Sequence, residues 1–353
     1  MQFTADKKTL YYFASIAGRS SAARSSMPVL SNVLIETLPD GIVAISGTNL
    51  ERHVRGKFSA KVSEDGATTV NAKSFLELVS LLDGDVEVAT KDNALVVKSG
   101  KAKTKLTTVP ATEFPPAPTT PNDALEVDAK EFLHALTSVY FSASTDEARP
   151  VMNGVRVKSN TLAASDGFRI AYNASGSELG DAVIPVDSIK EVVALFKDSK
   201  SLHVSINKNN AVFYDDQVTL LTQVIDGNFP DVDQIIPKST AIHAELASAD
   251  MLRAIKQANI ISRESNNAVT FAVSESAIVV TAHSEEVGAA EISVPCQSDG
   301  EITIAFNCNF LREGIEKCAS ESITFGMNGP NNPVIMTGKS DDWKYVIMPM
   351  ALS

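Results

Sequence analysis

Short runs of alternating apolar and polar residues dominate the chain and predict many β-strands. Each third of the sequence holds several such runs between turn-forming residues: 28–38, 41–47, 94–100; 154–160, 161–167, 211–225; 268–274, 277–284, 333–338. Two further segments in each third space their apolar residues at helical intervals, and they begin at residues 6 and 72, 128 and 186, 248 and 307. Strands follow one another more often than they alternate with helices, so the pattern predicts an α+β fold of antiparallel sheets with helices on one face.

The same order of elements recurs three times. A proline preceded by Phe or Met ends each third, at Pro115, Pro230 and Pro349, and the intervals are 230 − 115 = 115 and 349 − 230 = 119 residues, about one domain each. Apolar residues near the helix starts also match, as Leu10, Leu133 and Leu252 and as Phe75, Ile189 and Phe310. We therefore predict three similar domains, 1–120, 121–240 and 241–353, with linkers at 114–123 and 229–240.

Charge and composition limit the partners and the compartment. The formal net charge of −12 argues against a nucleic acid held by overall charge, so any contact with DNA must use locally placed cations. No stretch approaches the roughly 18 uncharged apolar residues of a membrane span, and the first residues do not form a secretory signal. Three cysteines without metal-ligand spacing fit a reducing compartment, so we expect a cytoplasmic protein that does not associate with membranes.

Motifs for catalysis are missing from the sequence. It has no GxSxG, P-loop, HExxH or strand-linked GxGxxG, and its five histidines are scattered. Asp166-Gly167-Phe168 superficially fits an aspartyl protease, but that chemistry needs two such loops with Ser or Thr after the aspartate, and no second copy exists. We therefore expect a protein that is not an enzyme and that has no cofactor and no metal.

Six segments in the order and spacing found here resemble the bacterial beta sliding clamp family, the processivity subunits of DNA polymerase III. They are MPVLSNVLIE (27–36), ARPVMNGV (148–155), LAASDGFRIA (162–171), DGNFPDVDQIIP (226–237), IAFNCNFL (304–311) and YVIMPM (345–350). The resemblance implies a DNA clamp fold and a head-to-tail ring homodimer that encircles duplex DNA without sequence preference. It also implies partners that dock through short peptides: the replicative polymerase, the clamp loader and repair polymerases.

The resemblance further implies a hydrophobic cleft for these peptides between the second and third domains. Its residues are Met152, Ser165, Gly167, Phe168, Arg169, Ile170, Pro230, Gln234, Ile235, Asn307, Phe310, Val334, Met348, Pro349 and Met350. Methionine is unbranched and polarizable, so a Met-rich pocket can adapt to several ligands. Gln234 and Ala351 stand where relatives often carry basic residues, which leads to the hypothesis that this chain's partners use a shifted peptide motif.

Basic residues on helices that face the hole are the expected DNA contacts. The candidates are Arg24, Lys7, Lys8, Lys73, Arg149 and Lys190. Lys98, Lys101, Lys103 and Lys105 alternate along a strand, and either edge protection or a contact with DNA or the loader would explain them.

Two alternatives to a replicative clamp of this design remain. A clamp-like peptide-binding scaffold, or a mobile-element clamp with altered partners, would share the fold and differ in ring closure or partners. The trimeric clamp with two domains per chain is disfavoured by the three repeats, because six domains per ring then require two chains.

Overall fold

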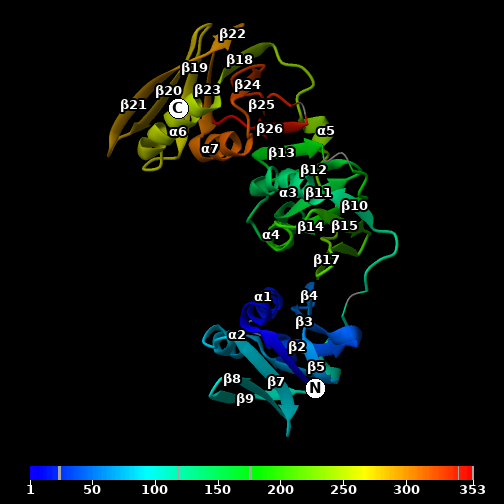
Figure 1. Cartoon of the computed structure of the whole chain (residues 1–353). Helices are drawn as coiled ribbons and strands as arrows, with labels where there is room; N and C mark the ends of the chain where they lie inside the picture. Colours follow the sequence, from blue (N-terminus) through cyan, green and yellow to red (C-terminus); the bar gives the residue numbers. More distant parts are fainter. Residues whose placement is uncertain (23–24, 118, 175–176, 341, 352–353) are drawn as a thin grey trace. The chain divides into compact units, whose positions relative to one another are not determined.

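The computed structural model describes residues 1–22, 25–117, 119–174, 177–340 and 342–351, and the chain forms two compact units (Figure 1). One unit comprises Met1–Lys130 with Lys190–Val224, and the other comprises Glu131–Ile189 with Ile225–Ser353. The middle third of the sequence therefore contributes to both units. Within the described part of the chain, no helix is long and apolar enough to cross a membrane.

Six amphipathic helices form where the sequence predicts them, two in each third. They are α1 (Lys7–Gly18), α2 (Ala72–Ser80), α3 (Ala129–Thr137), α4 (Val186–Leu195), α6 (Ser248–Ser262) and α7 (Cys308–Lys317). Asp6, Asn71 and Asn307 accept hydrogen bonds from backbone N–H groups in the first turns of α1, α2 and α7, which explains why these helices begin there. A single helical turn, α5 (Val232–Ile235), lies within the segment predicted as a linker.

The matching of apolar positions between helices needs a correction of one residue. The fourth residue of each helix is buried, namely Leu10, Phe132 and Met251 in the first set and Phe75, Ile189 and Leu311 in the second, and Leu133 is buried next to Phe132. Leu133, Leu252 and Phe310 come one position later or earlier. Adjacent apolar residues leave the pattern ambiguous, and the helix start decides which of them faces the sheet. Phe310 is therefore free to take part in a site.

All strands of the first unit in the described residues belong to one antiparallel sheet. Its order is β10-β15-β16-β17-β4-β3-β2-β6-β9-β8-β7-β1-β5. The strands are β1 (Gln2–Asp6), β2 (Asn32–Leu38), β3 (Ile42–Thr48), β4 (Arg52–Ser59), β5 (Lys61–Glu64), β6 (Ala67–Asn71), β7 (Asp85–Lys91), β8 (Ala94–Ser99), β9 (Ala102–Val109), β10 (Leu125–Asp128), β15 (Ser201–Ile206), β16 (Asn210–Tyr214) and β17 (Val218–Gln223).

The second unit has a nine-stranded and a four-stranded sheet, again antiparallel. Their orders are β14-β11-β12-β13-β26-β25-β24-β18-β22 and β21-β20-β19-β23. The strands are β11 (Gly154–Lys158), β12 (Thr161–Ser165), β13 (Arg169–Ala174), β14 (Asp181–Pro185), β18 (Ile242–Ala247), β19 (Ala268–Val273), β20 (Ala277–Ser284), β21 (Gly288–Pro295), β22 (Gln297–Ser298), β23 (Ile302–Asn307), β24 (Ser322–Met327), β25 (Val334–Thr337) and β26 (Trp343–Ile347).

Two equivalent strand pairings join the thirds of the sequence. The third strand after the first helix of a repeat is β4, β13 or β21, and the third strand after the second helix is β9, β17 or β26. β17 pairs with β4, and we name this pairing the first seam; β26 pairs with β13, and we name it the second seam. Ladder hydrogen bonds thus continue from one repeat into the next.

Two short 3-10 turns, each starting with a proline, precede strands β2 and β11. The strand predicted at 28–38 begins only at Asn32, because Pro28–Ser31 forms a turn in which Leu30 N–H donates to Met27 O. Pro150–Asn153 forms the equivalent turn before β11. A proline starts both turns, since its fixed φ suits a helical turn and its missing N–H is not needed there.

Candidate functional site

A hydrogen-bonded loop between β12 and β13 presents one large aromatic side chain to solvent. Ser165 Oγ donates to Arg169 O (2.8 Å) and accepts from Gly167 N–H (3.1 Å). Asp166 Oδ1 accepts from the N–H groups of Phe168 (2.9 Å) and Arg169 (3.1 Å). Gly167 has φ +91°, a conformation that glycine adopts without strain. Because the loop backbone is fixed in this way, the Phe168 side chain is held outward and is 60% exposed.

The residues after β26 are tied to this loop and to a neighbouring strand. Met348 N–H donates to Phe168 O (2.8 Å), and Met350 N–H donates to Ala305 O (2.8 Å). The apolar chain end is therefore ordered by backbone hydrogen bonds up to Met350, and Met348 remains partly exposed beside Phe168.

These elements enclose a small apolar groove of about 80 Å³ at the second seam. Its lining is Met152, Ser165, Gly167, Phe168, Arg169, Ile170, Pro230, Ile235, Val346 and Met348. The sequence named all of these except Val346. Because side chains alternate along an extended chain, Val346 and Met348 point to the same side. This alternation could have predicted that Val346 lines the groove.

The remaining predicted cleft residues do not line the groove itself. Val334 is fully buried, Asn307 caps α7, and Gln234 Nε2 donates to Asp231 Oδ2 (2.9 Å). Pro349 and Met350 follow the groove in the chain end. Sequence similarity indicates which segments surround the groove, but the direction of each side chain depends on the helix, strand or loop to which it belongs.

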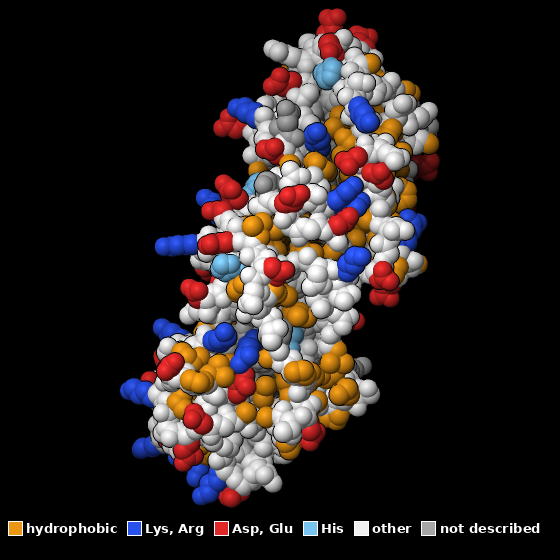
Figure 2. Space-filling view, turned by 90° about the vertical axis from the view of Figure 1, so that its right-hand side faces the viewer, with side chains coloured by type: hydrophobic (Ala, Val, Ile, Leu, Met, Phe, Trp, Pro, Cys, Tyr) orange, Lys and Arg blue, Asp and Glu red, His pale blue; other side chains and the backbone are white. Residues whose placement is uncertain are grey.

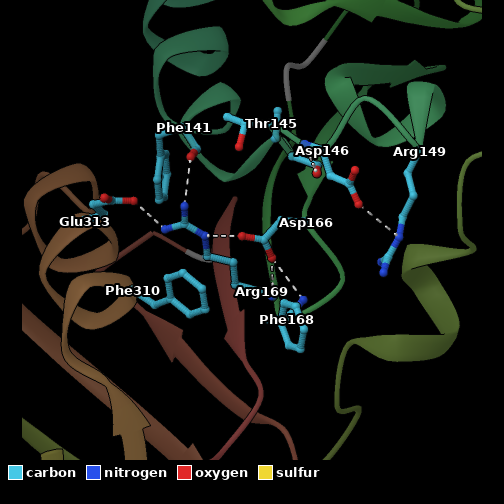
Figure 3. Close-up of a pocket in the computed structure, with 11 residues that line it drawn as sticks. Phe141, Thr145, Asp146, Arg149, Asp166, Phe168, Arg169, Phe310 and Glu313 are labelled. Carbon is cyan, nitrogen blue, oxygen red and sulfur yellow. Dashed lines mark hydrogen bonds and ion pairs between the residues drawn. The ribbon is translucent and has the colours of Figure 1, made fainter. Parts of the chain in front are cut away.

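A second hollow of about 450 Å³ adjoins the groove and shares Phe168 and Arg169 with it (Figure 3). Its lining is Phe141, Ala143, Ser144, Thr145, Asp146, Arg149, Asp166, Phe168, Arg169, Phe310 and Glu313. Phe310 thus belongs to this hollow. Sequence reasoning missed Glu313, because its partner Arg169 is 144 residues away in the chain. It also missed Asp166, although this residue is only three positions from Arg169.

Arg169 is the most heavily bonded side chain of this region. It is 8% exposed, and its Nε donates to Asp166 Oδ2 (3.0 Å). Nη1 donates to Glu313 Oε2 (2.5 Å) and Tyr345 Oη (3.3 Å). Burial alone would lower the pKa of Arg169, but its interactions with Tyr345 and Glu313 outweigh burial and raise it. The guanidinium is therefore charged at every pH at which the protein is folded.

The predicted DNA contacts lie in different surroundings. Lys8 and Lys190 are exposed on α1 and α4, Lys7 Nζ donates to Ser80 O (2.8 Å), and Lys73 lies 4.0 Å from a Glu77 carboxylate oxygen. Arg149 lies beside the groove, 3.8 Å from Asp146, instead of on a helix. Arg24 falls outside the described residues.

Charge on the visible face is mixed. Figure 2 shows acidic and basic side chains interspersed, without a continuous basic surface. Among the described residues, no three His, Cys, Asp or Glu side chains are grouped so that they could hold a metal ion.

Three repeats of antiparallel sheet with two helices each, joined through seams, define a DNA clamp fold. The chain belongs to the family of DNA polymerase III beta subunits: models of the N-terminal, central and C-terminal domains of that subunit match residues 1–118, 126–231 and 233–351. The fold class predicted from sequence is thus confirmed, whereas the domain borders at 120 and 240 stay predictions.

Named relatives and solved structures agree with this assignment. The chain is 27% identical over 339 residues to the beta sliding clamp of Chlamydia muridarum, covering 92% of each chain. It is 26% identical over 368 residues to that of Escherichia coli, covering 100% of each. The Thermotoga maritima beta subunit structure superposes with a TM-score of 0.90 at 25% identity over both full chains. The chain is therefore a DNA sliding clamp, a processivity factor without catalytic activity of its own.

Proposed function

We propose that this clamp tethers its partners through the groove at the second seam and works as a head-to-tail ring homodimer around duplex DNA in the cytoplasm. The partners are the replicative polymerase, the clamp loader and repair polymerases, each contributing a short peptide. A tethered polymerase stays at high effective concentration near the DNA, which is the physical basis of processivity.

The groove supports the peptide proposal through its shape and composition. It is concave and apolar, and it combines rigid backbone at the Ser165–Arg169 loop with the flexible side chains of Met152 and Met348. Phe168 is 60% exposed and shares the groove with Met348 and Ile235, each 38% exposed, and a contiguous exposed apolar patch is typical of an interaction site. A short segment with large apolar side chains would bury Phe168 and Met348 together.

Two strands that lack a partner in a neighbouring repeat support the proposal of a ring dimer. β17 and β26 each bridge to the preceding repeat, but β9 of the first repeat and β21 of the third have no such partner within the described chain. β9 pairs with β8 along its length and with β6 only at Thr108 and Val109, and β21 pairs with β20 alone. A second copy that pairs its β9 with β21 would complete the pattern, and two such seams close a ring.

Exposed apolar side chains support the same contact. Leu81, at the end of α2, is 82% exposed, and Ile260, on α6, is 55% exposed. At the first seam, Arg19 at the end of α1 forms an ion pair with Glu191 of α4 (2.8 Å), so helices also meet at a seam. By repetition, α2 of one copy would meet α6 of the other and cover Leu81 and Ile260.

A tail truncation tests the groove assignment. Deleting residues 348–353 removes Met348, and it also removes the backbone hydrogen bonds to Phe168 and Ala305. We expect a folded dimer that no longer binds a labelled peptide from the cognate polymerase and no longer stimulates that polymerase. Titration by fluorescence anisotropy and primer extension are the measurements. Full stimulation by the truncated dimer would overturn the assignment.

A further inference from the structure

The loops before β4 and β13, the strands that accept a seam partner, have the same hydrogen-bonding pattern. At the first seam, Thr48 Oγ1 donates to Arg52 O (2.9 Å) and accepts from Leu50 N–H (3.0 Å), as Ser165 does at the second seam. Asn49 Oδ1 accepts from Glu51 N–H (3.2 Å) and Arg52 N–H (2.7 Å), as Asp166 Oδ1 does at the second seam. The backbone frame is therefore a property of both seams, not of the groove alone.

The chain-end contact and the helix carboxylate are duplicated as well. Gln223 N–H donates to Glu51 O (2.8 Å) just as Met348 N–H donates to Phe168 O. Counting from the helix starts, Glu191 in α4 corresponds to Glu313 in α7, and each forms an ion pair with an arginine. The two seams thus form a natural pair for comparison within one molecule.

Side chains at two of the equivalent positions differ in kind. Glu51 and Ser188 at the first seam correspond to Phe168 and Phe310 at the second. Asn49 corresponds to Asp166, and Asp166 adds an ion pair, in which Arg169 Nε lies 3.0 Å from its Oδ2. Aromatic side chains and a second carboxylate are therefore what the second seam adds to the shared frame.

Arg169 connects these additions. Figure 3 shows its guanidinium between Glu313 and Asp166, with the rings of Phe141 and Phe310 on either side. The guanidinium carbon lies 4.4 Å from the Phe310 ring centroid and 5.6 Å from that of Phe141, within cation–π range. Its Nη2 also donates to Phe141 O (3.2 Å), so its direction is fixed.

Tyr345 and Gly314, which lie next to Arg169 and Glu313, restrain the main chain at Phe310. Tyr345 Oη donates to Phe310 O (3.0 Å) and accepts from Arg169. A Cβ on Gly314 would lie 2.3 Å from Tyr345 Cε1, so only glycine there lets α7 approach closely enough for Glu313 to reach Arg169. One buried cation consequently restrains both the loop with Phe168 and the helix with Phe310.

We propose that Arg169 is a positioning residue which, through Asp166 and Glu313, fixes Phe168 and Phe310 beside the groove and so selects partner peptides with an aromatic anchor. This inference rests on the proposed function of the groove. Aromatic rings attract one another in edge-on or offset geometry, and that preference acts only when the ring positions are held. Loss of a carboxylate would loosen the rings while leaving the apolar groove in place.

The test compares two peptides on the full-length dimer. Both are fluorescently labelled copies of the cognate polymerase's clamp-binding segment, and they differ only by Phe or Ala at the apolar anchor. Glu313→Gln removes the carboxylate's charge at nearly constant volume. We expect it to weaken the Phe peptide about five- to tenfold and the Ala peptide less than twofold, a coupling within the usual range for interacting groups. Glu313→Asp, which keeps the charge, should lie between parent and Glu313→Gln.

Glu191→Gln is the matched control, because it removes the equivalent carboxylate at the first seam. It should change neither peptide's affinity, and circular dichroism should show equal folding of all variants. If Glu313→Gln fails to fold, Asp166→Asn takes its place, since the amide oxygen still accepts the loop N–H bonds. Equal losses for both peptides, or no loss for the Phe peptide, would overturn the positioning role. A parent dimer that binds neither peptide would instead refute the proposed function of the groove.

Discussion

At the scale of single residues, the surroundings of a side chain decide its role more than its identity does. Arg52 and Arg169 occupy equivalent places, yet Arg52 donates to Ser20 Oγ (3.2 Å) and Arg19 O (3.3 Å) while Arg169 joins two carboxylates. The first arrangement ties a loop to the end of α1. The second links residues that border a binding groove.

His53 provides a prediction about pH. It is 5% exposed in β4 with its ring edge-on to Phe114, and its Nε2 has no hydrogen-bond partner among the described residues. Burial, with a smaller contribution from Arg55, lowers the pKa of His53 from 6.5 to about 4. The folded protein therefore keeps a neutral ring while the unfolded chain takes up a proton, so stability is full above pH 6.5 and falls as the pH drops toward 4.

The size of this effect can be measured by difference. At pH 4.5 the parent should lose about 2 to 3 kcal/mol of unfolding free energy through His53 relative to pH 7. His53→Gln cannot titrate, so its loss over the same interval should be smaller by that amount. Urea unfolding of both proteins at the two pH values gives the comparison. Identical pH dependence in parent and variant would mean that folding does not lower the pKa of His53.

At the scale of elements, the free strand edges determine what the chain can assemble with. Exposed cations alternate on β9, at Lys103 and Lys105, whereas β21 carries Glu291 and follows the exposed Glu285 and Glu286. Opposite charges on β9 and β21 favour pairing of β9 in one copy with β21 in another. They disfavour pairing of β9 with β9 or of β21 with β21.

The prediction that four lysines alternate along one strand is wrong, because Lys98 lies on β8 and pairs with Glu87, and Lys101 lies in the turn before β9. The proposed pairing of β9 with β21 would explain Lys103 and Lys105.

Charge reversal tests the edge pairing. The double substitution Lys103→Glu and Lys105→Glu should weaken dimerisation at least about tenfold. Acidic side chains would then lie on both strands of the proposed β9–β21 pair. Adding Glu291→Lys should recover part of the loss. Lys61→Glu on β5, an exposed lysine at the end strand of the same sheet, is the control and should leave the dimer intact. Sedimentation velocity over a dilution series measures all four proteins, and an unaffected double variant would contradict the pairing.

At the scale of the whole molecule, the acidic charge and the mixed surface fit a topological hold on DNA. A chain with a net charge of −12 cannot depend on releasing many counterions from DNA, so its attachment should resist salt. A peptide-binding scaffold that does not encircle DNA would lack this property, and the relatives of this chain do not favour that alternative.

Retention on circular DNA tests encirclement. After loading by the cognate loader, the clamp should stay on closed circular plasmid in about 0.5 M NaCl, where contacts with phosphate are strongly weakened. Cutting the plasmid once should release it, because a ring slides off a free end. Gel filtration of labelled clamp before and after cutting is the measurement. Equal release from circular and linear DNA would contradict encirclement.

The fold class, the threefold repeat and the family could be predicted from the residues alone. Alternating strands, helical spacing and recurrent proline positions are local or periodic signals, and they survive without knowledge of contacts. The sequence also named most of the groove, because Met152, the Ser165–Arg169 loop and Met348 lie in recognisable segments.

Which of these residues come into contact, and how they are held, depends on the packing of distant segments. Phe310 rather than Leu311 faces the hollow because the start of α7 sets the phase of the helix. Asp166 and Glu313 enter the site through Arg169, and Glu313 lies 144 residues away in the chain. Seam pairings join strands of different repeats, whereas β9 and β21 pair only with strands of their own repeat in the described part of the chain. Hydrogen bonds and ion pairs between distant segments depend on packing, and no local pattern encodes them.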